Sequence, residues 1–92
     1  MIRSFADRET EEFFFTGKSR RFSAILAVGF RKLQAMDNAQ ELSDLRHPPS
    51  NRLEALRGDR AGQHSIRVND QFRICFVWKD GAPELIEMVD YH

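Results

Sequence analysis

The sequence predicts a single α+β domain in which two helices pack on one face of a twisted sheet of antiparallel strands. The chain has 92 residues, enough for one hydrophobic core and too few for two. Its first half carries apolar residues at helical spacing, whereas its second half carries them at every other position. We therefore expect one domain over residues 1–92, in the order strand, two helices and a meander of strands.

The N-terminal part is expected to form a short strand and two helices. Residues 1–5 are typical of an opening strand. A helix is predicted over residues 6–16, because Asp7 is a suitable N-cap and Gly17 a suitable stop. From 20 to 36 the apolar residues recur at helical spacing, which predicts a second helix with one face on the sheet.

The second half is expected to form the sheet. Residues 37–51 are polar and contain two adjacent prolines, so a connecting loop is predicted there. Beyond it, period-two patterns predict consecutive antiparallel strands over residues 52–56, 63–68, 72–79 and 84–89.

Turn chemistry fixes one register. A three-residue turn at 69–71 places Ile66 opposite Ile74 on the core face, and therefore Arg67 opposite Arg73 on the other face.

The sequence leaves two possible facings for the last strand. Asp80-Gly81 predicts a second turn, but Glu87 interrupts the apolar alternation beyond it, so two registers are possible.

Composition excludes several classes of protein. Hydrophobic residues make up 41% and charged residues 30%, and no apolar run approaches the roughly 20 residues of a membrane span. The N-terminus has no signal-peptide pattern, so a cytoplasmic location is expected. The lone Cys75 lies in an apolar run and is predicted to be a buried thiol.

Metal and nucleotide motifs are missing from the sequence. His47, His64 and His92 lack the short ligand spacings of zinc sites, and neither a glycine-rich phosphate loop nor a Gly-x-Ser-x-Gly elbow is present. We therefore expect neither a metal nor a cofactor.

Charge is distributed unevenly although the net charge is zero. Residues 46–79 carry seven basic against three acidic side chains, and residues 80–92 carry four acidic and no basic ones. Metal-free RNA cleavage needs a base for the 2′-hydroxyl, cations at the phosphate and a proton donor for the leaving oxygen. Glu54 is a candidate base, and the candidate cations are Arg52, Arg57, Arg60, Arg67 and Arg73.

The C-terminus supplies candidates for the remaining role. Tyr91 can stack on a base or donate a proton, and His92 has a side chain that ordinarily titrates near neutrality; Asp90 precedes them. Each feature also has an ordinary interpretation, because surface arginines solvate a sheet face, Glu54 can pair with a nearby arginine, and chain ends often fray.

Three blocks of sequence resemble the HigB toxin family of the RelE superfamily. They are residues 53–60, residues 65–74 and the final Asp90-Tyr91-His92, and their order and separation also match. The resemblance implies a RelE-like fold whose open face takes messenger RNA in the ribosomal A site, with metal-independent, ribosome-dependent cleavage. It also implies neutralisation by a HigA-type helix-turn-helix antitoxin. The toxin is then expected to contact operator DNA only indirectly, through that antitoxin.

The resemblance also implies roles for individual residues. Arg73 corresponds to the arginine that stabilises the transition state, the three C-terminal residues to those implicated in cleavage, and Arg57 to a basic RNA-binding site. Two positions depart from the family pattern: Glu54 stands where some members have histidine, and Asn69 where a member has a basic residue. The identity of the base is therefore open.

A second hypothesis belongs to a different class of function. The chain is then a binding module that keeps the fold and the antitoxin contacts but serves only as a transcriptional co-repressor. The combination of Arg73 with Asp90-Tyr91-His92 favours the enzyme, since a co-repressor needs no proton donor beside a phosphate-binding arginine.

Overall fold

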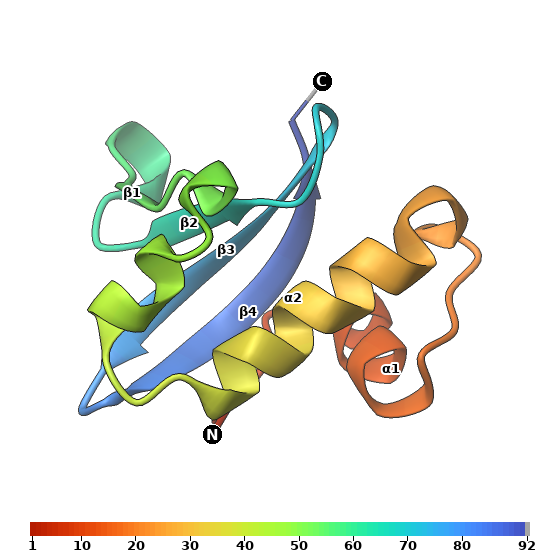
Figure 1. Cartoon of the computed structure of the whole chain (residues 1–92), viewed down its shortest axis with the longest axis horizontal. Helices are drawn as coiled ribbons and strands as arrows, with labels where there is room; N and C mark the ends of the chain where they lie inside the picture. Colours follow the sequence, from red (N-terminus) through yellow and green to blue (C-terminus); the bar gives the residue numbers. More distant parts are fainter. Residues whose placement is uncertain (92) are drawn as a thin grey trace.

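The computed structural model describes residues 1–91 and confirms the predicted α+β architecture. Two helices lie on one side of a four-stranded antiparallel sheet (Figure 1). The helices are α1 (Arg8–Thr16) and α2 (Leu26–Asn38), and the strands are β1 (Glu54–Ala55), β2 (His64–Arg67), β3 (Phe72–Lys79) and β4 (Ala82–Asp90), adjacent in chain order. His92, a predicted site residue, lies outside the described residues.

Helix α1 has the caps that the sequence predicts. The side chain of Asp7 accepts a hydrogen bond from the backbone N–H of Thr10 at 3.3 Å. At the other end Gly17 adopts φ 71°, a left-handed conformation that glycine takes without steric cost, and its N–H donates to the Phe13 carbonyl at 2.8 Å. These local contacts fix both ends of α1.

Helix α2 begins later than residue 20, so that part of the prediction is wrong. The hydroxyl of Ser19 accepts from the backbone N–H of Phe22 and forms a local turn. A 3₁₀ turn over Ser23–Ile25 follows, and Ile25, with φ −131°, lies outside the helical region. The chain therefore becomes α-helical only at Leu26.

The predicted opening strand is reduced to one parallel bridge between Phe5 and Ile86. The cause lies in β4, where Leu85 adopts φ 51° and donates its backbone N–H to the side-chain oxygen of Ser4. This side-chain contact replaces one step of a regular ladder, which leaves residues 1–5 attached to β4 without forming a strand.

The predicted strand over residues 52–56 is likewise shortened, to Glu54–Ala55. Arg52 closes a 3₁₀ turn over Pro49–Asn51 with φ 46°, a left-handed conformation that is incompatible with a strand. The region predicted as a loop contains this turn and a second one over Leu42–Arg46.

The predicted register between the second and third strands is confirmed. Ile66 pairs with Ile74 and Arg67 with Arg73. The open question about β4 is resolved by a bulge, which lies between the pairs Cys75–Glu87 and Val77–Glu84 and inserts one extra residue in β4.

The core lies between the helices and one face of the sheet. Its fully buried side chains come from α1, the segment before α2, α2 itself and the sheet: Phe13, Phe22, Leu33, Met36, Ile66, Ile74, Phe76, Ile86 and Met88. The end of β4 lies beside the β2–β3 hairpin (Figure 1), since Phe72 pairs with Asp90. Within residues 1–91, no helix is long and apolar enough to cross a membrane.

Candidate functional site

Arg73 is the centre of a polar cluster on the sheet face opposite the helices. Its Nε donates to the hydroxyl of Ser65 at 2.8 Å, and its Nη2 donates to the carbonyl of Arg52 at 3.0 Å. The same Nη2 lies 3.3 Å from Oε1 of Glu54. The side chain of Arg73 is only 12% exposed, so these three partners hold the guanidinium in one orientation.

The strand register explains why these residues meet. Glu54 of β1 pairs with Ser65 of β2. Arg67, two residues after Ser65 in β2, pairs with Arg73 of β3, so Ser65 and Arg73 are diagonal neighbours. Side chains two residues apart share a face. The left-handed conformation of Arg52 completes the cluster, since it directs a carbonyl toward Arg73.

Tyr91 lies against the same guanidinium. Its ring centroid is 5.6 Å from Cζ of Arg73, within the range of a cation–π contact. The β2–β3 turn holds this end of the chain, because the Gln71 carbonyl accepts from the N–H of Tyr91 at 2.6 Å and the Gln71 side chain donates to Asp90 at 3.0 Å. The structure therefore brings Tyr91 to Arg73 and keeps Asp90 beside it.

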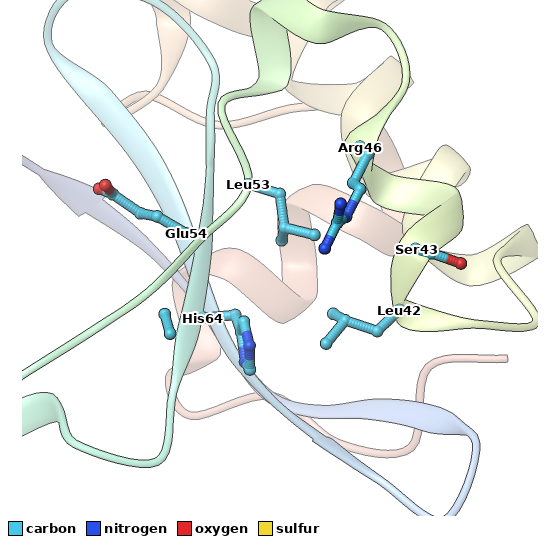
Figure 2. A pocket seen from close by; sticks show the side chains of 7 residues that line it. Leu42, Ser43, Arg46, Leu53, Glu54 and His64 are labelled. Carbon is cyan, nitrogen blue, oxygen red and sulfur yellow. The ribbon is translucent and has the colours of Figure 1, made fainter.

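A cavity of about 410 Å³ lies on the other side of Glu54. Its lining comes from the 3₁₀ turn after α2 and from β1 and β2: Leu42, Ser43, Arg46, Leu53, Glu54, Ala55 and His64. Figure 2 shows the Glu54 carboxylate directed away from Arg46 and His64. The carboxylate thus serves the Arg73 cluster and not this cavity.

Three predicted arginines lie outside the cluster. Arg60 donates to Gln63 at 3.0 Å and pairs with Glu87 at 3.2 Å. Arg57 is exposed and forms no ion pair within residues 1–91.

Arg67 is the third of these arginines. It lies opposite Arg73 in the ladder, but its guanidinium pairs with Asp70.

Cys75 is the buried thiol that the sequence predicts. The residue is fully buried, and burial raises the pKa of its thiol above the ordinary value of 9.0. Within residues 1–91, no group of three or more His, Cys, Asp or Glu side chains is arranged to hold a metal ion.

Sequence reasoning missed two residues that organise the cluster. Ser65 was detectable, because the register that pairs Arg67 with Arg73 also places Ser65 on that face. Gln71 had no such signal, since its contacts with Asp90 and Tyr91 depend on where β4 ends.

Comparison with known proteins assigns the chain to a family. Residues 3–92 match the family model described as the RelE-like toxin of the type II toxin–antitoxin system HigB. The chain belongs to the HigB-like toxin family. A member named Toxin HigB-1, from Vibrio cholerae, is 47% identical over 84 residues, which cover 89% of this chain and 88% of the relative. Another HigB protein, named Endoribonuclease HigB, from Proteus vulgaris, is 38% identical over 61 residues, 66% of this chain and 65% of the relative.

Solved structures agree with the HigB-like fold. The YoeB–YefM complex from Staphylococcus aureus contains a chain that superposes with a TM-score of 0.60 at 14% identity, covering all of this chain and 98% of that one. A heterotetrameric YoeB–YefM complex from the same organism gives a TM-score of 0.60 at 16% identity, with the same coverage. The α+β architecture of this HigB-like chain is therefore the one those toxin–antitoxin structures contain.

Proposed function

We propose that this HigB-like toxin is a ribosome-dependent endoribonuclease that cuts messenger RNA without a metal ion. The observation that carries the proposal is the Arg73 cluster, in which a fixed guanidinium lies between the carboxylate of Glu54 and the ring of Tyr91. Nη1 of Arg73 has no hydrogen-bond partner within residues 1–91, which leaves it for a phosphate oxygen. The relative named an endoribonuclease supports the same activity.

The reaction follows from the chemistry of RNA. The 2′-oxygen attacks the adjacent phosphorus while Glu54 takes its proton; the new O2′–P bond forms as the P–O5′ bond breaks. Arg73 stabilises the negative charge that develops on the phosphorane. The leaving 5′-oxygen takes a proton from the C-terminal segment, where we assign His92 as donor and Asp90 and Tyr91 as supporting residues.

The remaining arginines are proposed to bind RNA. Arg52 and Arg57 are exposed, and they flank Glu54 in the sequence. Within residues 1–91, neither has a carboxylate partner. Arg67 lies beside Arg73 in the ladder. Arg60 is the weakest of this set, because its guanidinium is already neutralised by Glu87.

The proposed protein partner is a HigA-type helix-turn-helix antitoxin. Membership in a toxin–antitoxin family supports a partner of this kind. In this scheme the toxin acts on cytoplasmic ribosomes when free and meets operator DNA only through the antitoxin.

The test is cleavage of a translated mRNA by purified protein, with and without ribosomes. The protein is first treated with EDTA and desalted, so that the ribosomes keep their own Mg²⁺. We expect cuts that need ribosomes and leave 2′,3′-cyclic phosphate ends, and a loss of about a hundred- to ten-thousandfold in Arg73→Ala. Lys79→Ala is the matched control, an exposed cation six residues along the same strand.

Each contrary result has a definite meaning. Undiminished cutting by Arg73→Ala would reject this site. If the intact protein binds its antitoxin and represses its operon but never cuts, the chain is a co-repressor.

A further inference from the structure

A second cationic site is a cavity of about 330 Å³ between α2 and the turn Pro49–Asn51, whose next residue, Arg52, accepts a hydrogen bond from Arg73. Three of its lining residues are Arg31, Lys32 and Arg67, and none is acidic. The full lining is Val28, Arg31, Lys32, Ala35, His47, Pro48, Ser50, Asn51, Arg67 and Val68. Positive charge is therefore concentrated at this cavity although the net charge of the chain is zero.

Lys32 is held in place by a neutral partner. Its ammonium donates to the side-chain oxygen of Asn51, which is 1% exposed. The amide nitrogen of Asn51 donates to the carbonyls of Leu45 at 3.1 Å and His47 at 3.2 Å, so the amide cannot turn. The ammonium is therefore fixed at the cavity without being neutralised.

The positive charges that line this cavity repel one another. Burial, and then the neighbouring charges of Arg31 and Arg67, lower the pKa of Lys32 below its ordinary value of 10.5. Within residues 1–91, neither Arg31 nor Lys32 has a carboxylate in ion-pair distance. Within the described part of the chain, Arg67 forms its ion pair with Asp70, whose side chain is 97% exposed and therefore screened by water.

Arg67 connects this cavity to the Arg73 cluster. It lines the cavity, and in the ladder it lies directly opposite Arg73, with Cα atoms about 5 Å apart in such a pair. Two like charges opposite each other destabilise a sheet. Asp70 and Glu54 each offset one of these charges, but both carboxylates are exposed, so an anionic chain that passes over both arginines adds charge compensation at the same place.

We infer that the cavity binds a backbone phosphate of the same RNA strand that Arg73 contacts at the phosphate to be cleaved. The inference rests on the proposed function for the identity of the strand. A phosphate suits the lining, because guanidinium and ammonium groups supply charged donors, whereas the lining offers a base a single aromatic ring, that of His47. The site therefore positions the strand and reads no sequence.

The test measures binding of a single-stranded 2′-deoxy oligonucleotide, which cannot be cut by the 2′-hydroxyl route, over a range of salt concentrations. Lys32→Gln removes the charge and keeps a donor for Asn51. Charge-assisted hydrogen bonds of this kind change affinity by roughly tenfold, so we expect that loss in Lys32→Gln and a larger one in the double variant with Arg31→Gln. The slope of log affinity against log salt should fall by about 0.7 for each phosphate that the variant no longer neutralises.

The control is Lys18→Gln, which removes an exposed charge from a loop that does not line the cavity. It should change neither the affinity nor the slope. An unchanged affinity and slope in the double variant, with unchanged thermal stability, would reject the inference.

Two further arms separate the sources of phosphate and the two proposals. Inorganic phosphate is titrated while the amide NMR signals of Lys32 and Asn51 are followed; saturation by inorganic phosphate without any oligonucleotide binding would reject an RNA site.

In the cleavage assay the double variant should raise KM and leave kcat unchanged. If the wild-type protein binds the oligonucleotide in the expected manner but never cuts, the cavity stands and the proposed function fails.

Discussion

Nη2 of Arg73 lies 3.3 Å from Oε1 of Glu54, and this ion pair joins the third strand to the first across the second. Its members differ in accessibility, because the Arg73 side chain is 12% and that of Glu54 55% exposed. The cation is therefore fixed within the sheet while the carboxylate remains open to solvent and substrate. This difference in exposure suits a fixed cation that stabilises negative charge and an accessible carboxylate that takes a proton.

Glu54→Gln tests the base directly. Glutamine keeps an oxygen that can accept from Arg73 but cannot take a proton at neutral pH, so cleavage should fall by about a hundred- to ten-thousandfold. Glu54→His should recover part of the activity, because a histidine can serve as base at this position. The measurement is the cleavage rate on translating ribosomes, with the exposed Glu41→Gln as control. A wild-type rate in Glu54→Gln would mean that Glu54 only orients Arg73.

Ser65→Ala tests how the guanidinium is positioned. The change removes the hydroxyl that accepts from Nε of Arg73 at 2.8 Å, and Ser65 is fully buried. We expect kcat to fall by roughly tenfold, the loss that corresponds to about 1.4 kcal/mol, with little change in KM. Ser43→Ala, at an exposed position, is the matched control. Equal losses in kcat and in folded fraction would indicate a purely structural role for Ser65.

Tyr91→Phe and Tyr91→Ala separate the ring from the hydroxyl. Phenylalanine preserves an aromatic face toward Arg73, whose Cζ lies 5.6 Å from the ring centroid. We expect cleavage by Tyr91→Phe to stay within a few fold of wild type, and Tyr91→Ala to lose about tenfold or more, as for other losses of aromatic stacking. Equally severe losses in both variants would instead identify the hydroxyl as the proton donor.

Part of this site was accessible from sequence because it depends on short-range rules. The alternation around the 69–71 turn predicts that Arg67 lies opposite Arg73, and the structure has that register. The ends of α1 could also be predicted from the sequence, since the capping hydrogen bonds of Asp7 and Gly17 are made to residues within one helical turn.

The rest depends on tertiary packing. Arg52 is a non-glycine residue at φ 46°, and no local pattern predicts that its carbonyl accepts from Arg73. The second cationic cavity joins Lys32, Asn51 and Arg67, which are distant in sequence and meet only when α2 packs beside the end of β2. The resemblance to HigB toxins supplied roles for Arg73 and the C-terminus, but not these contacts.

Asp44 gives a prediction about stability in acid. Its carboxylate accepts from the backbone N–H groups of Glu41 at 3.0 Å and Gln40 at 2.9 Å, and these bonds hold its pKa below the ordinary 3.8. Because the pKa of Asp44 is lower in the folded than in the unfolded protein, its carboxylate stabilises the fold fully above pH 3.8. This stabilisation is lost as the pH falls through the pKa of Asp44 in the folded protein. The contribution is therefore present at neutral pH and disappears in acid.

Asp44→Ala should lower the urea midpoint at pH 7, and its difference from wild type should shrink as the pH is lowered below 3.8. The measurement is urea unfolding at several pH values between 2.5 and 7, a range chosen to bracket the ordinary carboxyl values of about 4. Asp59→Ala, at an exposed position with no hydrogen bond or ion pair from its carboxylate within residues 1–91, is the control and should follow wild type throughout. A constant difference between Asp44→Ala and wild type across the whole range would show that the carboxylate's charge contributes nothing. The turn Leu42–Arg46 would then be held by its backbone hydrogen bonds, such as Asp44 N–H to the Glu41 carbonyl at 3.0 Å, and by packing of the buried Leu45.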